Sequence, residues 1–192
     1  HPRVRRQRQM CIRDRYNMKV AIIGAGNMGG SIACGLAKGK LIPASDIIVS
    51  NPSIGKLEAL KKEFPSIAIT RNNAEAATGA DIVILAVKPW LIRGVLREMK
   101  LRSKQILVSV AAGISFEQLA HDVVEPEMPM FRIVPNTAIS ELQSMTLIAS
   151  RNAGQELETL MVNLFSEMGM AMILPEDKLE AATALTSCGI AY

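Results

Sequence analysis

The chain has 192 residues, which suits one domain of ordinary size with the beginning of a second. Apolar residues make up 49% of the sequence, which excludes the intrinsically disordered class, and an aromatic content of only 4% argues against a base-stacking surface for single-stranded nucleic acid. The net charge of +4 is uneven: residues 18–192 hold 16 basic and 17 acidic residues, a net charge of about −1. This larger part gives no support to nucleic-acid binding.

Residues 1–17, HPRVRRQRQMCIRDRYN, contain six arginines and differ from all that follows. They lack the apolar core of a secretory signal, and for a mitochondrial presequence they lack serine and a long apolar face. A basic arm for nucleic acid is a weaker alternative. We expect residues 1–17 to be a non-native or disordered leader, with Met18 as the natural first residue. No apolar run reaches the roughly 18–20 residues needed to span a bilayer, and we expect a cytoplasmic protein.

The cysteines at positions 11, 34 and 188 lie far apart and form no CxxC pair. His121 is the one histidine of residues 18–192. This pattern predicts reduced thiols and no metal site.

From Met18 onward, short apolar runs alternate with helical patterns. In chain order, strands are expected at 19–24, 46–51, 67–70, 81–87, 105–110, 130–135, 144–150 and 171–175. Helices are expected between them at 27–39, 53–64, 74–78, 89–100 (with Pro89 at its first position), 115–123 (with Ser115 as its cap) and 154–169. The alternation predicts an α/β fold with a mainly parallel, doubly wound sheet covered on both faces.

The stretch GAGNMG, Gly24 to Gly29, follows the first expected strand and opens the first expected helix. In that context a G-x-G-x-x-G spacing indicates a dinucleotide-binding, Rossmann-type fold. Gly24 permits the tight turn, Gly26 lets a pyrophosphate approach the backbone, and Gly29 lets helix and strand pack closely. The phosphates would meet free N–H groups at the helix N-terminus.

The end of the second strand, SNPS (50–53), has no acidic residue. An acid there would bind the ribose of NAD and repel a 2′-phosphate, so its absence favours NADP over NAD. Ser50, Asn51 and Ser53 offer hydrogen bonds to such a phosphate, and Lys56 follows one helical turn later. No arginine lies in this segment to clamp the phosphate with two hydrogen bonds.

Three further segments close later strands: LAVKP (85–89), SVAAGI (109–114) and VPNT (134–137). Ligands of such sheets lie beyond the carboxyl ends of the strands, so these segments should face one crevice. Ala111, Ala112 and Gly113 leave room for a flat ring, and Lys88 is the one cation at its strand end.

Together with IGAGNMG and DKLEAATALTSCGIAY, these segments make the sequence from Met18 to Tyr192 resemble the pyrroline-5-carboxylate reductases. The resemblance implies reduction of 1-pyrroline-5-carboxylate to L-proline, the last step of proline biosynthesis, with NADPH or sometimes NADH. It also implies a homo-oligomer formed through C-terminal helices, while charge and hydropathy lead us to expect no nucleic-acid or membrane partner. The cofactor-binding residues expected from the motifs and the resemblance are Gly24, Gly26, Asn27, Met28, Gly29, Ser50, Asn51, Ser53, Asn73, Ala86, Val87, Lys88, Pro89, Ala111, Ala112, Gly113 and Asn136.

Two short segments depart from the family pattern: Ala138 stands where a proline is usual after N-T, and TSCGIAY (186–192) replaces SGSGPAY. Family members also continue for about a hundred residues of helices. We therefore expect a dinucleotide-binding domain at 18–175 and the start of a truncated helical dimerisation and substrate domain at 176–192, with exposed apolar residues near 179–185. We identify no catalytic acid; Lys88 is a candidate for orienting cofactor or substrate.

Two alternatives remain. One is an NADP-dependent oxidoreductase of the β-hydroxyacid dehydrogenase type or one that works with a deazaflavin. The other is a non-catalytic NADP-binding module.

Overall fold

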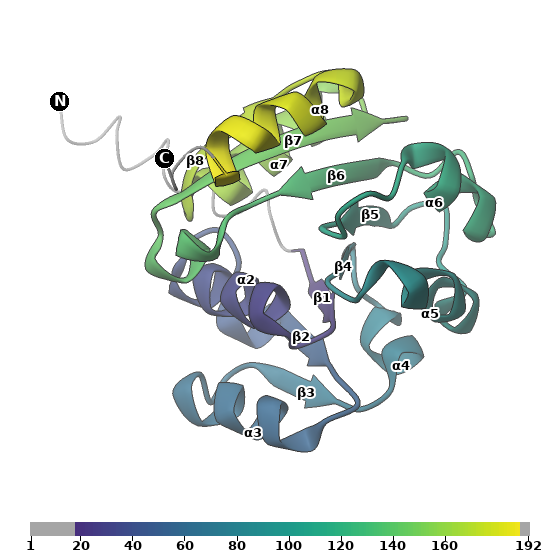
Figure 1. Cartoon of the computed structure of the whole chain (residues 1–192). Coiled ribbons are helices and arrows are strands. Elements are labelled where there is room, and N and C mark those ends of the chain that lie inside the picture. Colours follow the sequence, from purple (N-terminus) through teal and green to yellow (C-terminus); the bar gives the residue numbers. More distant parts are fainter. Residues whose placement is uncertain (1–17, 189–192) are drawn as a thin grey trace, which may run out of the picture.

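The computed structural model describes residues 18–188, and they form one twisted sheet with helices on both faces (Figure 1). The expected leader, 1–17, lies outside these residues. The strands of the sheet are β1 (Val20–Ile23), β2 (Ile47–Ser50), β3 (Ala68–Thr70), β4 (Ile82–Leu85), β5 (Ile106–Ser109), β6 (Met130–Val134), β7 (Ser144–Arg151) and β8 (Gly169–Ile173).

The order across the sheet is β3-β2-β1-β4-β5-β6-β7-β8. Strands β1 to β6 are all parallel, whereas β7 runs antiparallel to β6 and β8 runs parallel to β7. The order reverses between β1 and β4, where open α/β sheets bind their ligands.

Seven α-helices are found in the described part of the chain: α2 (Asn27–Lys38), α3 (Ile54–Glu63), α4 (Asn73–Ala77), α5 (Ile92–Met99), α6 (Phe116–Asp122), α7 (Gln155–Ser166) and α8 (Glu176–Thr183). Short 3₁₀ turns occur at Ala44–Asp46, Pro89–Leu91 and Thr137–Glu141, and a π-helical turn at Ala184–Cys188 follows α8. No helix within residues 18–188 is long and apolar enough to cross a membrane.

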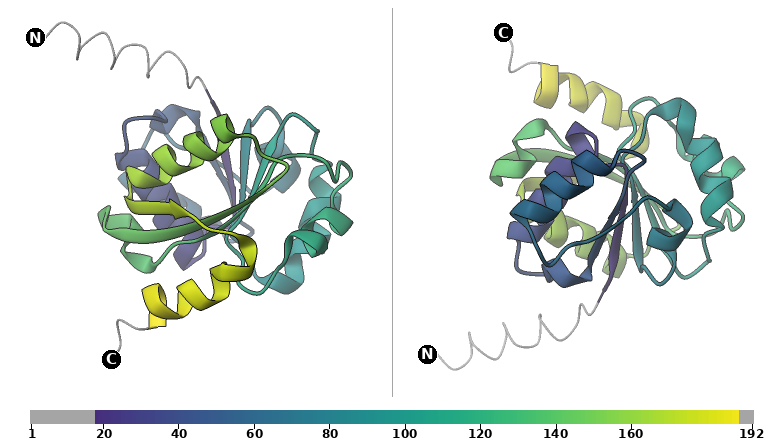
Figure 2. Two further views of the ribbon diagram at one scale, coloured as in Figure 1. Left: turned by 90° about the horizontal axis from the view of Figure 1, so that it is seen from above. Right: turned by 90° about the horizontal axis from the view of Figure 1, so that it is seen from below.

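Alternation along β1 separates the two layers of helices. Val20 and Ile22 pack in a core with α2, α3 and α7, whereas Ala21 and Ile23 pack in a second core with α4, α5, α6 and α8. All four side chains are fully buried, which explains why the strand is a continuous apolar run. The views in Figure 2 show helices on both sides of the sheet, so the predicted doubly wound α/β class is confirmed.

Two local expectations were wrong in detail. The helix predicted at 89–100 begins with a 3₁₀ turn, in which the N–H of Leu91 donates to the carbonyl oxygen of Lys88 at 2.9 Å, and only then becomes α5. Leu179, predicted to be exposed, is 1% exposed because α8 packs against the second core, whereas Leu185 is 77% exposed as expected.

Candidate functional site

A cavity of about 620 Å³ lies at the carboxyl ends of the parallel strands, across the point where the strand order reverses. It is lined by Gly24, Gly26, Asn27, Met28, Asn51, Pro52, Lys56, Asn73, Ala86, Val87, Lys88, Pro89, Leu91, Val95, Val110, Ala111 and Ala112. The strand ends of β1, β2, β4 and β5 therefore meet in one crevice, whereas VPNT (134–137), predicted to face the same crevice, contributes no lining residue.

Two of the three glycines are required by the protein's own packing. Gly24 has φ of +104°, and a Cβ there would lie 2.5 Å from the carbonyl oxygen of Ala86. A Cβ on Gly29 would lie 1.9 Å from the carbonyl oxygen of Gly24. The first turn of α2 is therefore packed directly onto the β1–α2 turn, which only glycine permits.

Gly26 is different, because a Cβ there would meet no protein atom within 4 Å. It is the N-cap of α2, and no side chain caps the helix. The first N–H groups of an α-helix have no acceptor within the helix. With Gly26 lining the cavity, the helix presents these donors and its positive dipole end to a space that the protein leaves open.

Asn51 braces the β2–α3 loop against the glycine turn. Its Oδ1 accepts a hydrogen bond from the N–H of Ala25 at 3.0 Å, and its Nδ2 donates to the carbonyl oxygen of Ser53 at 3.0 Å. Asn51 therefore lines the cavity and also fixes the shape of its wall.

Ser50 and Asn73 were both expected at the site, and they form a pair. The Ser50 hydroxyl, which is fully buried, donates to Oδ1 of Asn73 at 2.8 Å, and Nδ2 of Asn73 donates to Glu98 at 3.2 Å. Ser50 thus lies behind Asn73 and positions it, while Asn73 itself lines the cavity.

The charged residues that line the cavity are all positive. Lys56 and Lys88 line it, and none of the described residues that line it is an aspartate or a glutamate. Neither lysine forms an ion pair or a side-chain hydrogen bond with the described residues. The cavity therefore favours an anion, and its wall at the end of β2 offers no carboxylate to repel a 2′-phosphate.

The cavity wall at the end of β5 is apolar. Ala111 and Ala112 follow β5, and Leu91, Val95 and Val110 complete the wall there. Small side chains next to aliphatic ones leave space for a flat ring with little competition for hydrogen bonds.

Five of the predicted site residues do not line the cavity. Gly29 serves packing and Ser50 supports Asn73, while Ser53 is the exposed N-cap of α3 and Gly113 lies exposed in the β5–α6 turn at φ of +71°. Asn136 also ends a strand at this edge, but its Oδ1 accepts the N–H of Ala138 at 3.1 Å as the cap of a 3₁₀ turn.

Sequence reasoning missed four lining residues: Pro52, Leu91, Val95 and Val110. Leu91 and Val95 lie one turn apart on the helical segment after Pro89. The apolar periodicity of that segment is typical of a helix face that packs on the core, so it did not indicate a cavity wall. It also missed Arg71, whose Nε donates to the carbonyl oxygen of Pro52 at 3.2 Å. Residues 50–53 contain no arginine, but β3 pairs with β2 and brings Arg71 beside them.

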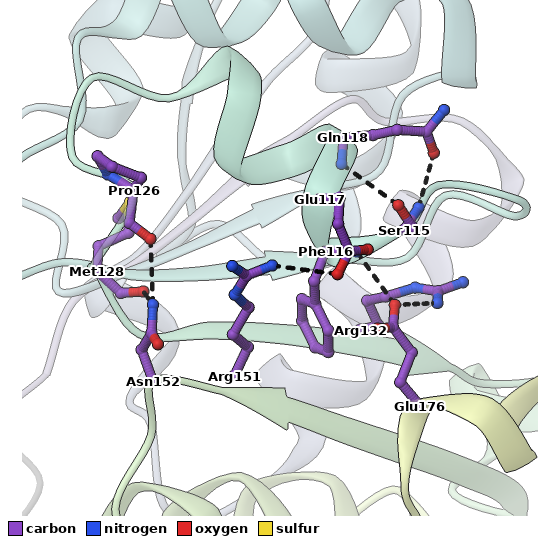
Figure 3. A network of polar contacts seen from close by, with 10 residues as sticks. All are labelled: Ser115, Phe116, Glu117, Gln118, Pro126, Met128, Arg132, Arg151, Asn152 and Glu176. Atoms are coloured by element: carbon purple, nitrogen blue, oxygen red, sulfur yellow. Dashed lines mark hydrogen bonds and ion pairs between the residues drawn. The ribbon is translucent and has the colours of Figure 1, made fainter.

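A polar network ties α8 to β6 and α6 (Figure 3). Oε1 of Glu176 accepts hydrogen bonds from Nη1 of Arg132 at 2.5 Å and from the N–H of Phe116 at 3.1 Å. Phe116 begins α6 beside the predicted cap Ser115, which forms a full capping box with Gln118. A backbone hydrogen bond, followed in importance by the Ser115 hydroxyl, lowers the pKa of Glu117 in the same turn.

Comparison with known proteins gives the same fold and family. Residues 19–113 match the family model described as NADP oxidoreductase coenzyme F420-dependent. Pyrroline-5-carboxylate reductase 3 of Danio rerio is 32% identical over 182 residues, which cover 93% of this chain and 62% of the relative. The pyrroline-5-carboxylate reductase of Pseudomonas aeruginosa is 33% identical over 178 residues, which cover 91% of this chain and 64% of the relative.

Two solved structures superpose on most of this chain. The pyrroline carboxylate reductase of Plasmodium falciparum with NADP bound superposes with a TM-score of 0.81 at 26% identity, over 92% of this chain and 65% of that one. The enzyme of Coxiella burnetii gives 0.83 at 28% identity, over 91% and 66%. The chain thus spans less than two thirds of the length of these relatives. The motifs, the sheet topology and these similarities show that the chain belongs to the pyrroline-5-carboxylate reductase family.

Proposed function

We propose that this chain is the cofactor-binding part of an enzyme that reduces 1-pyrroline-5-carboxylate to L-proline with NADPH. The observation that carries the proposal is the cavity itself: a bare helix N-terminus and two lysines face it, and no carboxylate lines it within the described residues. The proposed substrate follows from the names of the relatives, which are pyrroline-5-carboxylate reductases. The Plasmodium neighbour, solved with NADP bound, supports the choice of cofactor.

The cavity residues fit a dinucleotide along its whole length. The open position at Gly26 and the first N–H groups of α2 would hold the pyrophosphate, and Asn51 and Asn73 would line the adenosine half. The stretch Ala86–Pro89 and the pair Ala111 and Ala112 would flank the nicotinamide half. Gly113 and Asn136, outside the cavity lining, remain predictions from the family resemblance.

When bound, the reduced nicotinamide supplies the hydride, and the protein positions it. A ring imine needs a hydride at carbon and a proton at nitrogen, and its protonated form already attracts hydride. A strong general acid is therefore not essential, and none lines the cavity among residues 18–188. The contribution of this chain is proximity: a fixed cavity wall that holds the reacting ring in place. Lys88, exposed at the cavity edge, would orient cofactor or substrate by its charge.

The remaining parts of the proposal concern organisation. We propose a domain boundary near residue 175, with 176–192 beginning a helical dimerisation and substrate domain, and a cytoplasmic homo-oligomer. Leu185, 77% exposed after α8, supports a further apolar partner surface there. The unpaired thiol of Cys34 is in keeping with a reducing compartment.

NADPH oxidation with 1-pyrroline-5-carboxylate tests the proposal, measured for this chain and for the whole protein encoded by its gene. We expect turnover in the whole protein and NADPH binding without efficient turnover in the chain alone. NADPH binding without turnover in either would remove the proline assignment and favour a non-catalytic NADP-binding module. Turnover of a β-hydroxyacid instead would favour the other alternative.

A further inference from the structure

We propose that Arg71 recognises the 2′-phosphate of NADPH and so sets the preference for NADPH over NADH. The inference rests on the proposed function and adds a specificity residue to it. Arg71 comes twenty positions after Asn51 in the sequence, outside the segment in which a cofactor-selecting residue is expected.

The sheet brings Arg71 to the end of β2. Strand β3 pairs in parallel with β2, with Thr70 opposite Ser50, and the N–H of Asn51 donates to the carbonyl oxygen of Thr70 at 3.2 Å. Arg71 is the first residue after β3, so its backbone lies beside the start of the β2–α3 loop. In dinucleotide-binding folds the ribose 2′ position is recognised at the end of this second strand, and a nearby arginine accommodates the phosphate.

One hydrogen bond fixes where the Arg71 guanidinium lies. Its Nε donates to the carbonyl oxygen of Pro52 at 3.2 Å, and Pro52 lines the cavity. Within residues 18–188 the two terminal nitrogens of Arg71 have no hydrogen-bond or ion-pair partner. A guanidinium held by Nε with both terminal nitrogens free is arranged for a two-point contact with a phosphate.

The surrounding charges leave this guanidinium available. Glu75 accepts a hydrogen bond from the hydroxyl of Thr70, and Glu98 accepts one from Asn73. Neither carboxylate forms an ion pair with Arg71 in the described part of the chain. Lys56 on α3 lines the cavity and adds a second positive charge to this region.

The test is binding, measured by titration calorimetry on the whole chain with NADPH, NADH and 2′,5′-ADP. For Arg71→Gln we expect affinity for NADPH and 2′,5′-ADP to fall by about tenfold or more, because a charge-assisted two-point contact is lost. Affinity for NADH should change by less than about twofold, which also shows that the variant is folded. Arg71→Lys should lie between, since an ammonium keeps the charge without the fork.

Arg102→Gln is the matched control: Arg102 is also exposed and lies in the loop before β5, at the amino ends of the parallel strands, whereas Arg71 lies at their carboxyl ends. It should change none of the three affinities. Three results would each overturn the role of Arg71 and leave the oxidoreductase proposal in place. These are equal losses of NADPH and NADH affinity in Arg71→Gln, no loss of either affinity, and a wild-type chain that prefers NADH. A wild-type chain that binds neither dinucleotide would overturn both.

Discussion

The guanidinium of Arg132 on β6 donates a hydrogen bond to the carboxylate of Glu176, the first residue of α8, at 2.5 Å (Figure 3). The side chain of Arg132 is 10% exposed and that of Glu176 29% exposed. The pair therefore joins an interior strand of the sheet to the helix that follows the last strand.

Glu176→Gln should destabilise the domain, because it leaves the largely buried charge of Arg132 without an anion. We expect the free energy of unfolding to fall by about 2–4 kcal/mol, measured by urea denaturation. Asp177→Asn is the control, since within residues 18–188 Asp177 pairs only with Lys178 and both side chains are 68% exposed; its effect should stay within about 0.5 kcal/mol. Similar effects of the two substitutions would show that the Arg132–Glu176 pair does not anchor α8.

The glycines should separate into structural and binding positions. Gly29→Ala places a methyl group 1.9 Å from a backbone oxygen, and Gly24→Ala combines a 2.5 Å clash with a φ of +104°, so both should unfold the protein or destabilise it by several kcal/mol. Gly26→Ala meets no protein atom and should change stability by less than about 1 kcal/mol.

Gly26→Ala should nevertheless weaken NADPH binding by at least about tenfold, because its methyl group occupies the space in which we place the pyrophosphate. Titration calorimetry and thermal unfolding of the same sample give both values. Undiminished NADPH affinity in this variant would place the dinucleotide elsewhere.

Lys88→Met should raise KM or lower kcat for NADPH oxidation in the whole enzyme. Lys88 is exposed and has no ion pair among the described residues, so its loss should leave the unfolding midpoint unchanged. Lys104→Met, an exposed lysine in the loop before β5, is the control and should alter neither rate nor KM. Kinetics of Lys88→Met equal to those of wild type would remove any role for its charge in orientation.

Cys34 should resist alkylation at alkaline pH. Burial, followed by the charge of Glu63, raises the pKa of its thiol above the ordinary value of 9.0. The reactive thiolate should therefore form at higher pH in the folded protein than in urea. Because the folded pKa is the higher one, the associated stability is present below pH 9.0 and is lost as the pH rises from there through the folded pKa.

Iodoacetamide labelling across a pH series, read by mass spectrometry of the tryptic peptide that contains Cys34, measures this difference. Cys11 and Cys188 fall in other peptides and do not interfere. The same labelling midpoint with and without urea would contradict the prediction.

The sequence predicted all eight strands because each is a short apolar run, and the burial of β1 and β4 on both faces explains that pattern. It also predicted the Ser115 cap and most of the cavity, since strand ends in a parallel sheet share one edge. These features depend on local spacing alone.

What the sequence did not predict depends on the arrangement of segments in space. The sequence around Leu179 does not indicate that α8 packs on the sheet, because the residues that Leu179 packs with come from distant strands and helices. Asn136 has the right position for a ligand contact, but a neighbouring backbone N–H takes its side-chain oxygen. The position of Arg71 beside Pro52 depends on the pairing of β3 with β2, which the sequence alone does not indicate.

The close contact between Gly24 and Gly29 has a mechanical consequence. With backbone against backbone, the β1–α2 turn and the first turn of α2 must move as one rigid body, so the site we assign to the pyrophosphate needs little reorganisation when an anion arrives. The β2–α3 loop, in contrast, is held there by side-chain hydrogen bonds from Asn51 and Arg71. The selectivity that we propose for Arg71 would thus rest on side chains at the ends of β2 and β3 and not on the packed glycine turn, and substitutions there should change it without loss of the fold.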